Sequence, residues 1–106
     1  MAVAAAALMC FGAWSSAQAQ FAAEAPAEVA IEAFVFQPAA ITVPAGTTVT
    51  WTNNDPVAHS VTDVDGVWDS GLFEQGGVYS KTFTEPGTYT YYCIPHPMMI
   101  GTIEVQ

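Results

Sequence analysis

The segment YYCIPHPMMIG near the end of the chain brings several metal-binding side chains close together. Cys93 is followed by His96 three positions later and then by Met98 and Met99. A thiolate, an imidazole and a thioether are soft donors, and one more imidazole would complete the set of two histidines, a cysteine and a methionine found in blue-copper electron-transfer sites. The only other histidine is His59. The donor types therefore predict a copper site made by these residues, and the spacing alone leaves open which methionine takes part.

The same side chains also fit three other kinds of site. A structural zinc ion is well served by two histidines and a cysteine but gains little from a thioether. A copper-delivery protein would use the same ligands to hold Cu(I) and pass it on. A catalytic thiol would need a base and an oxyanion site near Cys93, and the two histidines are the only candidates for that base. Both histidines are used by one site, so the chain has none left for the further coppers of a multicopper oxidase.

The N-terminal residues predict export. Residues 1–19 consist of an apolar stretch of about 13 residues, too short for a bilayer-spanning helix of ~20, and an Ala-Gln-Ala end typical of signal cleavage. The positively charged start of such a signal is absent. We expect a cleaved secretory signal peptide at 1–19, a loose lead at 20–28, a single domain at 29–106 and a periplasmic location. Cys93 would then be the only thiol of the mature chain in an oxidising compartment.

The rest of the chain has the pattern of an all-β protein. Short runs rich in β-branched and aromatic residues are separated by Pro, Gly, Asn and Asp turn signals, and no useful helical periodicity follows residue 28. The predicted strands are 29–38, 41–43, 47–53, 59–63, 78–84, 87–93 and 101–105. This spacing predicts an antiparallel β-sandwich or barrel of about seven to eight short strands.

Strand alternation then places the metal-binding side chains. Tyr89, Tyr91 and Cys93 fall on one face of their strand, which we expect to be the inner face. Cys93 therefore ends a strand with its sulfur toward the core, and the proline-flanked loop after it is short and stiff. His59 begins another predicted strand, and antiparallel neighbours bring the end of one strand beside the start of the next. We therefore expect His59 to meet Cys93 and His96.

The charge balance limits the partners. Ten acidic residues oppose one lysine, Lys81, for a net charge of −9. This charge disfavours nucleic acid and anionic membranes. Four acids gather in the connection after the His59 strand: Asp63, Asp65, Asp69 and Glu74. They could steer a positively charged redox partner or serve solubility alone.

Three segments give the chain a family resemblance over roughly residues 29–106: TTVTWTNNDPVAHSV, FTEPGTYTYYC and CIPHPMM. The chain resembles the cupredoxins, the blue type 1 copper proteins, and is most similar to amicyanin and the small single-domain periplasmic cupredoxins. The short C-x-x-H-x-x-M spacing with prolines on both sides of the histidine is the most specific of these features. The resemblance implies the Greek-key sandwich of the cupredoxin type and one type 1 copper ion that alternates between Cu(I) and Cu(II).

The resemblance also implies roles for single residues. His59, Cys93 and His96 would form the strong trigonal ligand set, with Met99 as the long axial contact. Two departures concern the usual asparagine after the first histidine and the usual Thr or Ser after the cysteine, because this chain has Ser60 and Ile94 there. In the family these two side chains are hydrogen-bonded to each other. Ile94 has no side-chain donor, so we expect this side-chain bond to be missing, although the Ser60 backbone N–H could still donate to the Cys93 sulfur. We therefore expect the surroundings of the ligands to be held less securely.

The function that follows is electron transfer without catalysis. No paired carboxylates or Ser/His/Asp arrangement share the site, so we expect a small soluble electron carrier and not an enzyme. The rival function is periplasmic copper binding and delivery. We expect protein redox partners, such as a c-type cytochrome or a periplasmic dehydrogenase or oxidase, to dock near His96. We expect a monomer without stable membrane insertion.

Overall fold

The computed structural model describes residues 27–106, which form eight strands and no helix. The strands are β1 (Ala27–Glu32), β2 (Val35–Gln37), β3 (Ala40–Val43), β4 (Thr47–Asn53), β5 (Thr62–Asp63), β6 (Val78–Phe83), β7 (Gly87–Tyr92) and β8 (Ile100–Val105). In this part of the chain no helix is long and apolar enough to cross a membrane. The predicted signal peptide and most of the predicted lead lie outside the described residues.

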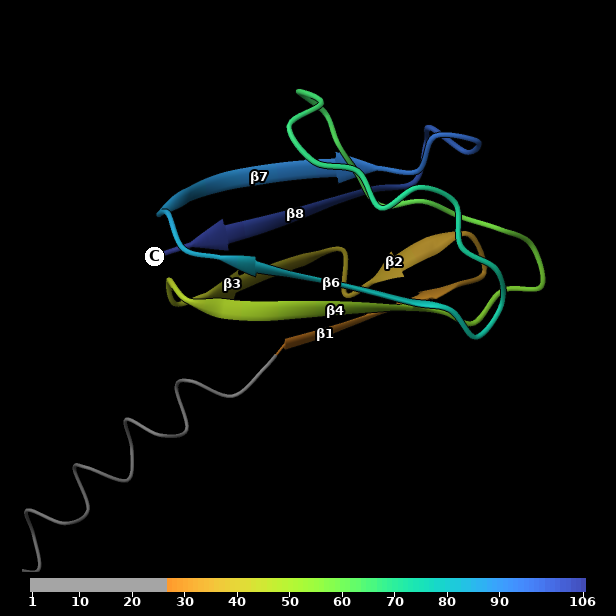
Figure 1. Ribbon diagram of the computed structural model, residues 1–106, viewed down its shortest axis with the longest axis horizontal. Helices are drawn as coiled ribbons and strands as arrows, with labels where there is room; N and C mark the ends of the chain where they lie inside the picture. Colours follow the sequence, from red (N-terminus) through yellow and green to blue (C-terminus); the bar gives the residue numbers. More distant parts are fainter. Residues whose placement is uncertain (1–26) are drawn as a thin grey trace, which may run out of the picture.

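The strands form two four-stranded sheets that lie face to face as a sandwich (Figure 1). One sheet has the order β2-β1-β4-β6 and the other the order β3-β8-β7-β5. The predicted sandwich of about eight short strands is therefore confirmed. Most neighbouring strands are antiparallel, but β1 pairs with β4 and β3 pairs with β8 in parallel, so each sheet is mixed.

The core lies between the sheets and follows from alternation along the strands. In β4 every second residue is buried, from Thr47 to Asn53, as a two-residue side-chain period requires. The buried apolar residues are Val29, Ile31, Phe36, Val43, Val49, Trp51, Val61, Phe83, Tyr91, Cys93, Met99, Ile103 and Val105. Tyr91 and Cys93 are fully buried and Tyr89 packs against this core, so the predicted inner face of β7 is confirmed.

The predicted strand 29–38 is wrong in one respect, because the chain turns back within it. β1 and β2 pair as an antiparallel hairpin around Ala33 and Phe34. Both turn residues have positive φ angles, 55° and 61°, the conformation of a type I′ turn that normally takes Asn or Gly. Neither residue type is present here, so the sequence carried no turn signal at this point.

The connections that carry the predicted ligands meet at one end of the sandwich. The connection after β4 and the loop after β7 both lie at the end opposite the C-terminus (Figure 1). The predicted strand 59–63 is shorter than expected, because β5 contains only Thr62 and Asp63. His59 is instead held by an isolated bridge to Phe73, with backbone hydrogen bonds of 3.2 and 2.9 Å.

Candidate metal centre

Three of the predicted ligands come together at this end of the fold. The metal-binding atoms of His59, Cys93 and His96 all lie within 4.8 Å of one another. His59 Nδ1 is 3.4 Å from Cys93 Sγ, and His96 Nδ1 is 3.6 Å from the same sulfur. His59 and Cys93 are fully buried and His96 is half-buried. One thiol and two imidazoles thus face a single point, and of these three residues His96 alone is partly exposed.

The loop after β7 is folded tightly by its own backbone. The Cys93 N–H donates to the Met99 carbonyl at 3.2 Å, the His96 N–H to the Cys93 carbonyl at 3.1 Å, and the Met99 N–H to the His96 carbonyl at 2.9 Å. Pro95 and Pro97 have no N–H to offer and restrict φ. The loop therefore returns Met99 to the side of Cys93 in six residues.

The two methionines of the loop have opposite environments. Met99 is 5% exposed and belongs to the core, whereas Met98 is 90% exposed. Only Met99 therefore lies on the inner side of the loop with Cys93. This burial separates the two residues that the spacing alone left equivalent.

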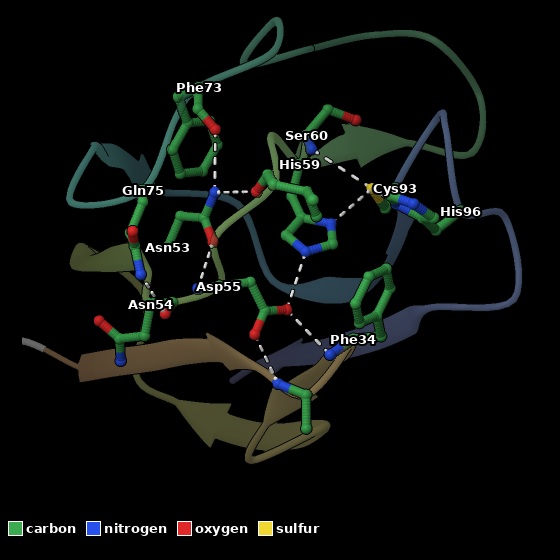
Figure 2. A network of polar contacts seen from close by, with 12 residues as sticks. Phe34, Asn53, Asn54, Asp55, His59, Ser60, Phe73, Gln75, Cys93 and His96 are labelled. Carbon is green, nitrogen blue, oxygen red and sulfur yellow. Dashed lines mark hydrogen bonds and ion pairs between the residues drawn. The ribbon is translucent and has the colours of Figure 1, made fainter.

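The orientation of His59 is set from outside the cluster. Its Nε2 lies 2.9 Å from Asp55 Oδ2, while its Nδ1 faces Cys93 (Figure 2). Because an ionised carboxylate can only accept hydrogen bonds, this contact places a proton on Nε2. In the neutral imidazole the lone pair is then on Nδ1, which points at the cluster.

Asp55 also binds the strained hairpin turn. Its Oδ1 accepts the Ala33 N–H at 2.7 Å and its Oδ2 accepts the Phe34 N–H at 2.9 Å. Burial alone would raise the pKa of Asp55, but the two backbone N–H groups and His59 outweigh it and hold the pKa below its usual value. One carboxylate therefore fixes both a turn with two positive φ angles and the ring of His59.

Asn53, at the end of β4, holds the segment that presents Asp55. Its side-chain oxygen accepts the Asp55 N–H at 2.9 Å, and its side-chain nitrogen donates to the carbonyls of Val57 and Phe73 at 2.9 and 3.0 Å (Figure 2). Sequence analysis placed Asn53 at the end of a predicted strand and gave neither Asn53 nor Asp55 a part in the site. An aspartate four positions before a predicted ligand was the available signal.

The residues that depart from the cupredoxin pattern still connect the two ligand segments. The Ser60 N–H points at Cys93 Sγ at 3.4 Å, and the Ser60 hydroxyl accepts the Ile94 N–H at 2.9 Å. The side chain of Ile94 takes no part, as expected, and the connection between the two segments runs instead through the Ile94 backbone amide. The backbone amide of Ile94 supplies the donor that its side chain lacks.

The outer side of the cluster is apolar. Phe34, which is 45% exposed, meets both imidazoles edge-to-face, with ring centroids 5.2 Å from His59 and 4.8 Å from His96. A hollow beside His96 is lined by Phe34, Pro97, Met98 and Met99. Sequence analysis expected partners to dock near His96 but did not include Phe34, because the hairpin that places Phe34 there was not predicted.

The types of donor atom and their burial indicate which metal ion would fit the site. A thiol and two imidazoles with an adjacent thioether match the soft, trigonal preference of a type 1 copper site. A tetrahedral structural zinc site would use a fourth strong donor instead of a thioether. The site thus defines the chain as a copper-binding β-sandwich of the blue-copper class.

Comparisons with known proteins agree with this class. Residues 23–106 match the family described as copper binding proteins, plastocyanin/azurin family. Amicyanin-alpha of Methylorubrum extorquens is 38% identical over 95 residues, which cover 78% of this chain and 76% of that protein. Plastocyanin of Scenedesmus fuscus is 39% identical over 87 residues, which cover 70% of this chain and 89% of that protein. A solved Cu(I) form of an amicyanin variant has a TM-score of 0.73 at 36% identity and covers 76% of this chain and 82% of that one.

The chain belongs to the plastocyanin/azurin family of copper-binding proteins. Within that family it is similar to amicyanin in sequence and in structure. It is a small blue-copper electron carrier with one type 1 copper.

Proposed function

We propose that His59, Cys93 and His96 would be the strong copper ligands and that Met99 would be the weaker fourth ligand. The convergence of the first three within 4.8 Å carries this assignment. The burial of Met99, against the exposure of Met98, supports the choice of methionine. The proton on His59 Nε2, held by Asp55, leaves Nδ1 free to bind the metal.

Bound copper would supply a one-electron Cu(II)/Cu(I) couple. The protein's part is to hold the ligands in one geometry that serves both oxidation states, so that little has to move when an electron passes. His59 is held through Asp55, and the loop that carries Cys93 and His96 is closed by its own backbone. The mature chain acts as a carrier and not as an enzyme.

The electron leaves and enters on the His96 side. His96 is half-buried and lies beside the apolar hollow formed by Phe34, Pro97 and Met98. Small apolar contacts suit brief redox encounters. A c-type cytochrome or a periplasmic dehydrogenase or oxidase would dock there, on a monomeric protein exported to the periplasm.

The test is copper loading of the mature protein, followed by visible and EPR spectroscopy. We expect an intense thiolate-to-copper band and a small hyperfine splitting, both lost in Cys93→Ser. Met99→Ala should shift both spectra, and Met98→Ala is its matched control because it removes the same side chain from the exposed side of the loop. A blue band retained in Cys93→Ser would overturn the ligand assignment.

Copper retention separates the carrier from a delivery protein. We expect copper to stay bound through repeated reduction and reoxidation in the presence of a Cu(I) chelator. Transfer of the reduced ion to the chelator within one cycle would instead identify a copper-delivery protein.

A further inference from the structure

Three side chains outside the ligand set form a continuous line of hydrogen bonds that begins next to Cys93. The Ile94 N–H donates to the Ser60 hydroxyl at 2.9 Å, and the Ser60 and Thr62 hydroxyls are 2.9 Å apart. The Thr62 hydroxyl donates to Asp69 Oδ1 at 2.8 Å. The line therefore connects a backbone amide of the predicted metal-binding loop to a carboxylate on the surface.

The direction of every bond in this line is determined by its ends. A backbone N–H can only donate, so the Ser60 oxygen accepts from Ile94. An ionised carboxylate can only accept, so Thr62 gives its single hydroxyl proton to Asp69. Thr62 then has no proton left for Ser60, and Ser60 must donate to Thr62. Each hydroxyl accepts one bond and donates the next, an arrangement in which the bonds polarise one another.

The line is buried where it meets the metal-binding segments and exposed where it ends. Ser60 and Thr62 are buried, whereas Asp69 is exposed and its Oδ1 also accepts the Gly71 N–H at 3.0 Å. Thr62 lies in β5 and pairs with Tyr92 of β7. The carboxylate end is therefore attached to the connection after β5, and the amide end lies directly after Cys93.

Ser60 contacts the predicted cysteine ligand in two ways. Its N–H points at Cys93 Sγ at 3.4 Å, and its hydroxyl holds the amide of the next residue, Ile94. Ser60 also directly follows His59 in the sequence. A shift of Ser60 would thus move the imidazole segment, the sulfur contact and the Cys93–Ile94 peptide group together.

We propose that Ser60, Thr62 and Asp69 are positioning residues for the copper site, acting as one directed hydrogen-bond line that fixes the Cys93–Ile94 peptide group against the His59 segment. The inference rests on the proposed ligand roles of His59 and Cys93. The chain has no direct hydrogen bond between the side chains of Ser60 and Ile94, the residues that follow the two ligands. It has instead this hydrogen-bond line, or relay, which ends at the carboxylate of Asp69.

The first measurement is amide hydrogen exchange in the copper-free protein, which does not depend on any ligand assignment. Ser60→Ala removes the acceptor of the Ile94 N–H, and we expect that amide to exchange at least about tenfold faster, or ~1.4 kcal/mol. Thr62→Val should give a smaller increase, and Thr62→Ser, which keeps the hydroxyl, should restore the slow rate. The matched control is Ser80→Ala, because Ser80 forms a 2.8 Å hydroxyl pair with Thr50 on the other sheet.

The second measurement uses the copper-loaded protein and reports on the metal. Removing a group that positions a ligand typically costs about 10- to 100-fold in metal affinity, so we expect Ser60→Ala to lose copper faster by that factor and to shift the reduction potential. Asp69→Asn keeps an acceptor oxygen but removes the charge, and it should fall between wild type and Asp69→Ala in both readouts.

The outcomes distinguish this inference from the ligand assignment. If Ser60→Ala matches Ser80→Ala in Ile94 exchange and in copper loss, the relay has no positioning role and the inference fails. If Asp69→Ala leaves Ile94 amide exchange and copper loss at wild-type values, Asp69 is not part of the hydrogen-bond line. A blue band that survives Cys93→Ser would instead refute the ligand assignment, while the exchange result would still stand.

Discussion

Replacing Asp55 with alanine removes a carboxylate that makes three hydrogen bonds beside the predicted metal centre. Its carboxylate accepts the Ala33 and Phe34 amides and the Nε2–H of His59. A buried donor left without a partner costs about 1–3 kcal/mol, and His59 is fully buried. The two turn residues are exposed, so water can replace their bonds and each contributes only about 0.5–1 kcal/mol. The expected loss of stability is roughly 3 kcal/mol.

The assay is thermal unfolding of the copper-free protein. For a domain of 60–100 residues each kcal/mol shifts Tm by about 4–8 °C, so Asp55→Ala should lower Tm by roughly 12–24 °C. Asp55→Asn keeps one acceptor oxygen but turns an amide NH2 toward the remaining donor, so its Tm should lie in between. Asp65→Ala is the control, since it removes the same charge from an exposed residue.

The pKa of Asp55 determines how the Tm difference between wild type and Asp55→Ala changes with pH. The folded pKa of Asp55 is lower than its ordinary value of 3.8, so its contribution to stability is present above that pH and is lost as the pH falls further. The Tm difference between wild type and Asp55→Ala should therefore shrink below about pH 4. A Tm shift under about 3 °C at pH 7, or a difference that stays constant under acid, would refute the hydrogen-bond argument.

Two further predictions concern Tyr91. A Cβ at Gly101 would overlap the Tyr91 ring that crosses it from β7. Gly101→Ala should therefore cost about 1–3 kcal/mol or more of stability. A Tm within about 2 °C of wild type would contradict this packing. Burial raises the pKa of Tyr91 from 10.0 to about 12, so its contribution is complete below pH 10 and is lost as the pH rises toward 12. Tyr91→Phe cannot ionise and should lose less stability across that interval in denaturant titrations; equal losses in the two proteins would show that Tyr91 does not drive the alkaline change.

The sequence was sufficient for features that depend on neighbouring residues. Alternation along 87–93 put Tyr91 and Cys93 on the buried face, and the prolines around His96 indicated a short stiff loop. Both properties depend on backbone geometry within a few residues, so they can be predicted from the local order of residue types.

The features that were missed depend on contacts between distant segments. The turn at Ala33 and Phe34 has no turn residue of its own and is held by Asp55, more than 20 residues away. The parallel pairing of β1 with β4 likewise depends on the global topology and not on local pattern. The Ser60 hydroxyl bonds a backbone amide, and a backbone amide is present at every non-proline residue, so the side-chain pattern could not reveal it.

The two imidazoles of the cluster are held by different kinds of contact, and this difference bears on how electrons pass. His59 is fully buried and its outer nitrogen is bound to a carboxylate that is itself held by two amides. His96 is half-buried, and its neighbours on the outer side are apolar and aromatic. Polar contacts fix the inner ring in one orientation, whereas the outer ring faces the surface that a partner can cover without having to pair buried charges. With the docking at His96 that we propose, the fold would keep the firmly held imidazole inside and leave the exchange of electrons to the edge at His96.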